Sequence, residues 1–220
     1  MRGYILTMLN TLLRPGLLAF GLCVAPTLGA AHPHVFIETA VRAVVDEDGT
    51  FKGVEVTWTY DDFYSLLLFA DMKLDSDADG SLRPDELAQL EGFDLNWVEG
   101  YEGDSYALRN GVPVALGAPE SRGVNVENGR IISSHFRAAD APASGVVIKI
   151  YDPTFYTAYE IVGQVEVDGP CTASVEPANL DEAYSYVEEL LYATPASQAQ
   201  DEFPEVGDRF ADTVMLSCQS

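Results

Sequence analysis

Apolar and polar residues alternate along the first part of the chain that has a regular pattern. Between positions 35 and 45, one set of alternate positions carries apolar side chains at Val35, Ile37, Val41, Ala43 and Val45. A second alternating segment over 54–60 follows the turn-forming sequence "DEDG" at 46–49. Alternation with a period of two gives each face of a strand its own set of side chains. The pattern therefore predicts an antiparallel hairpin with one buried face.

The spacing of the apolar residues becomes helical after this hairpin. Over 61–74 they recur at three- and four-residue intervals, at Phe63, Leu66, Leu67 and Ala70. A second helix is predicted to begin near Pro84, because proline is tolerated in the first turn of a helix, and to end before Gly100. The two helices and the acidic segment between them form a predicted helix–loop–helix insertion at about 61–99.

Strand-like segments return between 106 and 175, with glycine, proline and asparagine between them. A later helix is predicted near Asn179 or Asp181, either of which suits its N-cap, from the amphipathic set Leu180, Ala183, Val187, Leu190 and Leu191. The predicted fold is α+β and mainly antiparallel β, arranged as a sandwich or a curled sheet. It contains the helix–calcium loop–helix insertion and this one late amphipathic helix.

The acidic segment at 75–86 reads "DSDADGSLRPDE". Carboxylates on alternate positions, then a glycine, then a glutamate at the twelfth position are typical of the calcium loop of an EF-hand. The expected Ca²⁺ ligands are the side chains of Asp75, Asp77, Asp79 and Glu86 and the backbone carbonyl of Ser81. The alternative is an acidic turn that binds only water.

Two features favour a structural role for this calcium over a regulatory one. Arg83 occupies the ninth position of the loop, where its side chain can neither accept a hydrogen bond nor hold a water in the usual way. The sequence also has no second loop of this spacing, whereas calcium sensors pair their loops. A lone loop in a secreted protein is typical of a weak site, with a dissociation constant of roughly 10⁻⁴–10⁻³ M.

The first 31 residues have the features of a secretory signal. Arg2 and Arg14 are their only charges, an apolar run covers 17–25, and Gly29 and Ala31 fit the positions before a signal-peptidase cut. The pattern predicts a signal peptide over 1–31 and a single periplasmic domain over 32–220. Because the apolar run is short, no membrane span is expected after cleavage.

The mature chain would contain two cysteines, Cys171 and Cys218. An even number of cysteines in an oxidising compartment predicts one disulfide, and two free thiols are the alternative. The formal net charge of the whole chain is −23, and no cluster of lysine or arginine occurs in it. Nucleic acid is therefore excluded as a partner recognised by charge.

The three histidines are the candidate ligands for a transition metal. Cleavage after Ala31 makes His32 the first residue, so that its α-amine and imidazole can chelate a metal, with His34 and His135 completing the shell. Imidazole suits Ni²⁺, Co²⁺, Zn²⁺ and Cu²⁺. The alternatives are a disordered terminus and a structural His135, and cleavage after Ala30 would remove the amine chelate. No nucleophile–base arrangement stands out, so an enzyme is not expected.

Several segments together resemble one bacterial family of periplasmic proteins of unassigned activity. They are "AHPHVFIE" after the signal, "GVEVTWTYDDFYS", the "DSDADGSL" loop, "IYDPTFY" and a late cysteine. Members of that family are described as the periplasmic component of an uncharacterised ABC-type transport system, and they often accompany nickel/cobalt-type permeases. The resemblance implies a role in metal handling and no known reaction.

These observations lead to two functional hypotheses. The first is a non-enzymatic periplasmic protein that delivers or buffers a divalent transition metal for an inner-membrane transporter, with a structural calcium site. The second is a calcium-dependent protein-interaction module, in which a partner recognises the calcium-bound loop.

Overall fold

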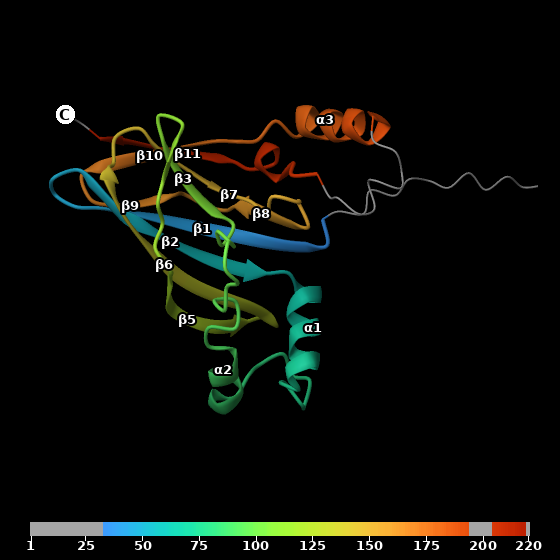
Figure 1. Cartoon of the computed structure of the whole chain (residues 1–220). Helices are drawn as coiled ribbons and strands as arrows, with labels where there is room; N and C mark the ends of the chain where they lie inside the picture. Colours follow the sequence, from blue (N-terminus) through green and yellow to red (C-terminus); the bar gives the residue numbers. More distant parts are fainter. Residues whose placement is uncertain (1–32, 194–203, 219–220) are drawn as a thin grey trace, which may run out of the picture. The chain divides into compact units, whose positions relative to one another are not determined.

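A computed structural model of the chain describes residues 33–193 and 204–218. The predicted signal peptide and His32 lie outside these residues. The described chain forms two β-sheets that share one hydrophobic core, together with three helices, which confirms the α+β class (Figure 1).

The first sheet has the strand order β5-β6-β2-β1-β8, and β9 also pairs with β1. Its strands are β1 (Val35–Val45), β2 (Thr50–Tyr60), β5 (Pro119–Glu127), β6 (Arg130–Pro142), β8 (Thr157–Ile161) and β9 (Glu166–Asp168). The predicted hairpin is confirmed as β1 and β2, which pair antiparallel with Val41 opposite Val56. Asp46 closes its turn, because its Oδ1 accepts the N–H of Thr50 at 2.8 Å. The sheet is mixed, since β8 and β9 run parallel to β1.

The second sheet has the order β10-β11-β7-β3-β4. Its strands are β3 (Ser105–Arg109), β4 (Val112–Val114), β7 (Val146–Ile150), β10 (Cys171–Glu176) and β11 (Thr213–Cys218). The predicted disulfide joins Cys171 and Cys218, which face each other in the β10–β11 pair. The tail of the described chain is thereby tied covalently to the sheet.

The core lies between the two sheets. Val54, Val56 and Ile131 contribute to it from the first sheet, and Val146 and Ile148 contribute from the second. All five side chains are fully removed from solvent. The alternating pattern of the sequence has placed these residues inward, as a half-buried strand requires.

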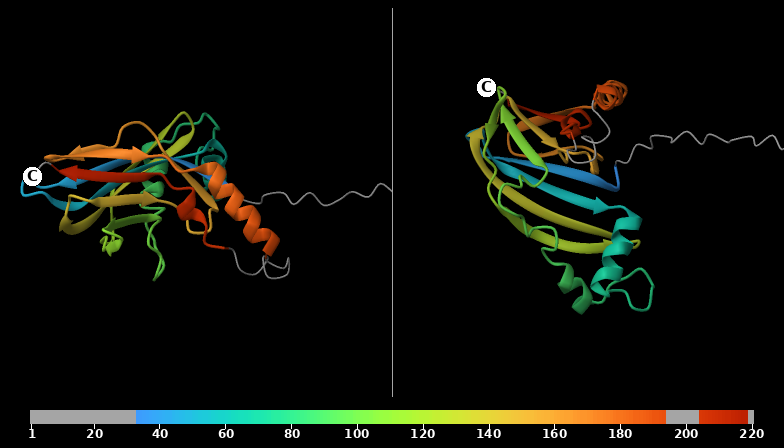
Figure 2. Two further views of the ribbon diagram at one scale, coloured as in Figure 1. Left: turned by 90° about the horizontal axis from the view of Figure 1, so that it is seen from above. Right: turned by 45° about the vertical axis from the view of Figure 1, so that its right-hand side comes forward.

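The helical insertion is present as α1 (Asp62–Met72) and α2 (Pro84–Leu90), of which the second is shorter than predicted. Asp61 caps α1 by accepting the N–H of Tyr64 at 2.8 Å. Pro84 begins α2, as expected for a first-turn proline. α1 packs against β6 and α2 against β5, so both lie at one end of the first sheet (Figures 1 and 2).

The late helix is α3 (Leu180–Ala193), and a short 3₁₀ turn, η1 (Gly207–Arg209), precedes β11. Of the two expected caps, Asn179 serves α3, because its side-chain oxygen accepts the N–H of Glu182 at 3.3 Å. α3 packs on a small separate cluster that contains Ala183, Val206 and Phe210. No helix in the described ranges is both long and apolar enough to cross a membrane.

Candidate functional site

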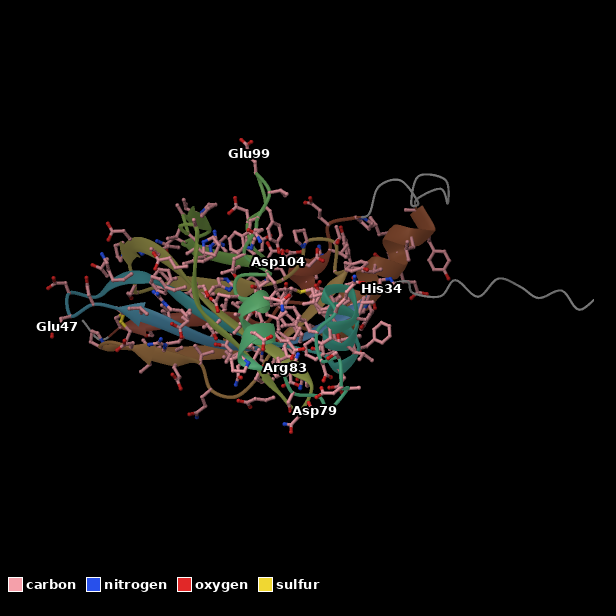
Figure 3. All side chains as sticks on the ribbon, turned by 90° about the horizontal axis from the view of Figure 1, so that it is seen from below. His34, Glu47, Asp79, Arg83, Glu99 and Asp104 are labelled. Carbon is pink, nitrogen blue, oxygen red and sulfur yellow. A yellow bond between two sulfur atoms is a disulfide. The ribbon has the colours of Figure 1, made fainter. Side chains whose placement is uncertain are left out.

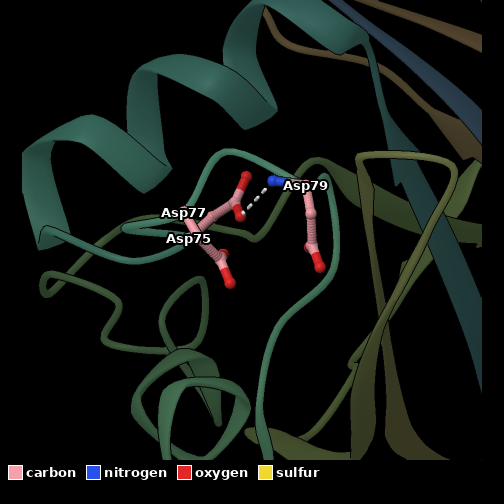
Figure 4. A group of neighbouring side chains, drawn as sticks. All are labelled: Asp75, Asp77 and Asp79. Carbon is pink, nitrogen blue, oxygen red and sulfur yellow. Dashed lines mark hydrogen bonds between the residues drawn. The ribbon is translucent and has the colours of Figure 1, made fainter.

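The acidic loop lies between the end of α1 and the start of α2. One carboxylate oxygen from each of Asp75, Asp77 and Asp79 lies within 4.8 Å of the others (Figure 4). Ca²⁺ binds oxygen at about 2.3–2.6 Å, so two of its ligands are separated by at most about 5 Å. The three aspartates therefore have the spacing of ligands on a single ion.

Backbone N–H groups hold this arrangement in place. Asp75 accepts the N–H of Asp79 at 3.0 Å through Oδ1 and that of Gly80 at 3.1 Å through Oδ2. Asp79 in turn accepts the N–H of Ser81 at 2.8 Å. Gly80, the glycine of the predicted loop pattern, has a φ of +77°, a left-handed conformation that favours glycine.

Glu86, the expected closing ligand, does not join the three aspartates. It is buried, and its Oε2 accepts the backbone N–H of Arg83 at 3.0 Å, which caps α2. Its Oε1 accepts the Arg83 guanidinium at 2.6 Å. Both carboxylate oxygens are therefore engaged by one residue, and an ion at this position would compete with the Arg83 guanidinium for Oε1.

Several acidic side chains lie far from the 75–79 segment. Figure 3 shows Glu47, Glu99 and Asp79 projecting from widely separated parts of the molecule. Within the described residues, the 75–79 segment supplies the one group of three or more histidine, cysteine or acidic side chains that is close enough to share an ion.

The predicted transition-metal ligands are separated in the structure. His34 is exposed at the start of β1, and its ring lies 4.9 Å from that of Tyr156. His135 lies on β6, in register with Val56, which is paired with Val41 of β1. Seven residues of strand and two strand spacings separate the two histidines, or about 25 Å along the sheet. One ion cannot be bound by both, so the predicted joint site of His34 and His135 is not formed.

His135 lies instead in an aromatic part of the core. The Trp58 ring contacts it edge-on at 4.7 Å and the Trp97 ring at 5.7 Å. Neither ring nitrogen has a hydrogen-bond partner among the described residues. Burial, with a smaller effect from the charge of Arg137, lowers the pKa of His135 to about 4. The imidazole is therefore neutral at neutral pH.

A family model matches residues 17–218, and its description is "Protein of unknown function (DUF1007)". The chain belongs to this family. For DUF1007 the description gives no activity, which agrees with the unassigned activity implied by the resemblance. No curated protein matches the chain. Among solved structures, the acetylcholine-binding protein type 1 of Biomphalaria glabrata is similar at 12% identity, over 89% of this chain and 91% of that one, with a TM-score of 0.33.

The structure of this DUF1007 member also shows a buried carboxyl that the sequence patterns did not indicate. Asp104 precedes β3, and its Oδ2 accepts the hydroxyl of Tyr159 at 2.8 Å, while its Oδ1 has no partner among the described residues. Burial raises the pKa of Asp104 to about 6, against the opposing hydrogen bonds from Tyr159 and Tyr101. The sequence shows only a "EGD" turn here, with no sign that the aspartate points inward.

Proposed function

We propose that this protein is a non-enzymatic periplasmic protein that binds divalent cations, with Ca²⁺ in the 75–86 loop as a stabiliser of the helical insertion. The observation that carries the calcium proposal is the grouping of three carboxylate oxygens within 4.8 Å of one another. Like charges so close repel, and a divalent cation converts that repulsion into attraction.

The loop supplies part of the shell that Ca²⁺ requires. The ion takes six to eight oxygens, and the three aspartates with the carbonyl of Ser81 provide four of them. Glu86 adds two when it turns away from Arg83, and water completes the shell. Bound calcium would link the end of α1 to the start of α2, which is the role of a structural clip.

Thermal unfolding with and without calcium tests this proposal. Millimolar Ca²⁺ should raise the melting temperature of the wild-type protein above its value in a chelator, because binding to the folded state alone stabilises it. Asp77→Asn with Asp79→Asn should abolish this rise. Asp48→Asn is the matched control, because it removes a carboxylate from the other acidic turn, at 46–49. An equal rise in the double variant would refute the calcium site.

We further propose that the mature N-terminus handles a transition metal for an inner-membrane transporter. The ligands are His32, through its α-amine and imidazole, and His34, which is exposed directly before β1. His135 is removed from this ligand set by its distance and burial. The support is the exposed position of His34 and the metal-handling role implied by the resemblance.

Titration with Ni²⁺, Co²⁺, Zn²⁺ and Cu²⁺ tests the metal proposal on protein that begins at His32. Binding should weaken at least tenfold in a variant with alanine at His32 and His34 and stay unchanged in His135→Phe. The same affinity in the double variant would remove the N-terminal site. Blocking the α-amine by acetylation distinguishes the amine chelate from binding by the imidazoles alone.

The second candidate function, a calcium-dependent interaction module, is favoured by one observation. The helix that leads into the calcium loop exposes large apolar side chains, of which Phe63 is 73% accessible. Calorimetry separates the candidates: micromolar calcium affinity with a conformational change supports a module, and weak binding that only stabilises supports a clip.

A further inference from the structure

Helix α1 has apolar side chains on two of its faces. The buried face contains Ser65 and Phe69 and packs on the sheet. The opposite face exposes Phe63, Leu66 and Leu67, at 73%, 63% and 49% accessibility. These three residues have i, i+3, i+4 spacing and form one continuous stripe. We name Phe63, Leu66 and Leu67 the α1 stripe. Grouped exposed apolar side chains of this kind mark interaction sites.

An acidic hollow lies beside the first turn of α1. Its volume is about 340 Å³, and its lining includes Phe36, Glu38, Asp61, Asp62, Arg130 and Glu160. Phe36 is itself 53% exposed, so an apolar side chain borders the hollow. Asp62 lines the hollow and lies four positions before Leu66 on α1, so that the hollow and the α1 stripe are contiguous.

The hollow has an excess of negative charge that a cationic side chain of a partner could balance. Four carboxylates line it against one guanidinium, and that guanidinium, of Arg130, is paired with Glu38 at 2.9 Å. Glu38 and Glu160 are direct neighbours on the parallel strands β1 and β8. Among the described residues, neither Glu160 nor the carboxylate of Asp62 forms an ion pair. Like charges side by side are unfavourable, and a basic side chain inserted between them relieves this repulsion.

We propose that the α1 stripe and the acidic hollow together form a docking surface for a basic amphipathic segment of a partner protein. Large apolar side chains of that segment cover the α1 stripe, and a lysine or arginine enters the hollow. This surface gives the second candidate function a partner of defined chemistry, and it rests on that candidate only for its dependence on calcium.

The charge pattern argues against the other occupants. A second copy of the chain would bring Asp62 and Asp71 of one α1 towards the same residues of its partner, and each copy carries a net charge of −23. An anionic lipid surface would meet the same repulsion. A basic partner is attracted by the hollow and by the calcium loop that follows α1. His34 directly precedes β1 and lies two positions before Phe36, and both side chains are exposed, so a partner docked here approaches the proposed metal-binding terminus.

Fluorescence anisotropy with a labelled amphipathic lysine–leucine peptide of about 18 residues tests the proposal, since such a helix spans about 27 Å. We expect saturable binding by the wild-type protein. Leu66→Ser with Leu67→Ser should weaken it at least about tenfold, as expected for two central apolar anchors. Glu160→Gln should weaken it severalfold. Leu191→Ser is the matched control, because Leu191 of α3 is also 49% exposed, and it should leave the affinity unchanged.

The remaining arms separate the alternatives. A peptide with glutamate in place of lysine should not bind. The proposal is overturned if the double leucine variant binds the peptide as tightly as the wild type does. It is also overturned if the wild type dimerises in a concentration-dependent way that the double variant loses. Co-sedimentation with phosphatidylcholine vesicles that depends on the same leucines would overturn it too. Each titration is run in Ca²⁺ and in a chelator. If peptide binding requires the α1 stripe but has the same affinity with and without Ca²⁺, the docking surface is supported and only the calcium-dependent module is refuted.

Discussion

Replacing Arg83 with alanine should strengthen calcium binding. In the structure the guanidinium of Arg83 engages Oε1 of Glu86 at 2.6 Å, and the backbone N–H of Arg83 engages Oε2 at 3.0 Å. In the proposed calcium site both oxygens would serve as the bidentate ligand of the ion. The Arg83 guanidinium would then compete with the ion for Oε1, and the Arg83→Ala variant removes that competitor while it keeps the backbone N–H that caps α2.

The size of the effect follows from the exposure of the two partners. The side chain of Arg83 is 52% exposed and that of Glu86 is 5% exposed. Exposed ion pairs contribute about 0.2–1 kcal/mol, and a pair with one buried member belongs at the upper end of that range. A competing interaction of about 1 kcal/mol corresponds to roughly a fivefold change in affinity. Removal of a positive charge close to the cation acts in the same direction.

Isothermal titration with Ca²⁺ at constant ionic strength measures this change. Arg109→Ala is the control, because it removes the same charge from the protein at β3, in the other sheet. The reasoning is refuted if Arg83→Ala binds calcium no more tightly than wild type, or if Arg109→Ala tightens binding equally. The second result would mean that net charge, and not the release of Glu86, controls the affinity.

Three further predictions concern stability. Replacing Cys171 and Cys218 with serine should lower the free energy of unfolding, measured in urea, by about 3–4 kcal/mol, because the bond closes a loop of about 47 residues. Burial raises the pKa of Asp104 from 3.8 to about 6, so the folded state binds the proton of this carboxyl more tightly than the unfolded state. The free energy of unfolding should therefore fall as pH rises from 3.8 to about 6. Asp104→Asn should remove this fall, as measured by denaturant titrations at a series of pH values. Burial lowers the pKa of His135 from 6.5 to about 4, so the free energy of unfolding falls as pH falls from 6.5 to about 4. His135→Phe should remove this fall. If either variant keeps the pH dependence of the wild-type free energy of unfolding, the replaced residue is not its cause.

The β1–β2 hairpin, the helices and the disulfide were predictable because each depends on nearby residues or on few choices. The alternation around Val41 sets the buried face of a strand, and the 46–49 turn brings the next strand back beside it. The two cysteines that follow the predicted signal peptide leave one intramolecular pairing, Cys171 with Cys218. The geometry of Asp75 and its neighbours was likewise encoded by local spacing, because their carboxylates accept N–H groups no more than five residues away.

The side chains that sequence reasoning misplaced depend on contacts between distant strands. Helical spacing identified α1 but could not tell which apolar face is buried, because the helix has two, and the sheet covers the face with Phe69 while Leu66 remains exposed. His135 could be a ligand partner of His34 only if β1 and β6 were neighbours, yet β2 lies between them. The register then places His135 beside Trp58 in the core. An exposed apolar helix face and a buried neutral histidine both break the usual pattern of a stable fold, and such exceptions are expected where a sequence is constrained by function. The α1 stripe is accessible to a partner and His135 is not, so the search for a binding partner should begin at the stripe.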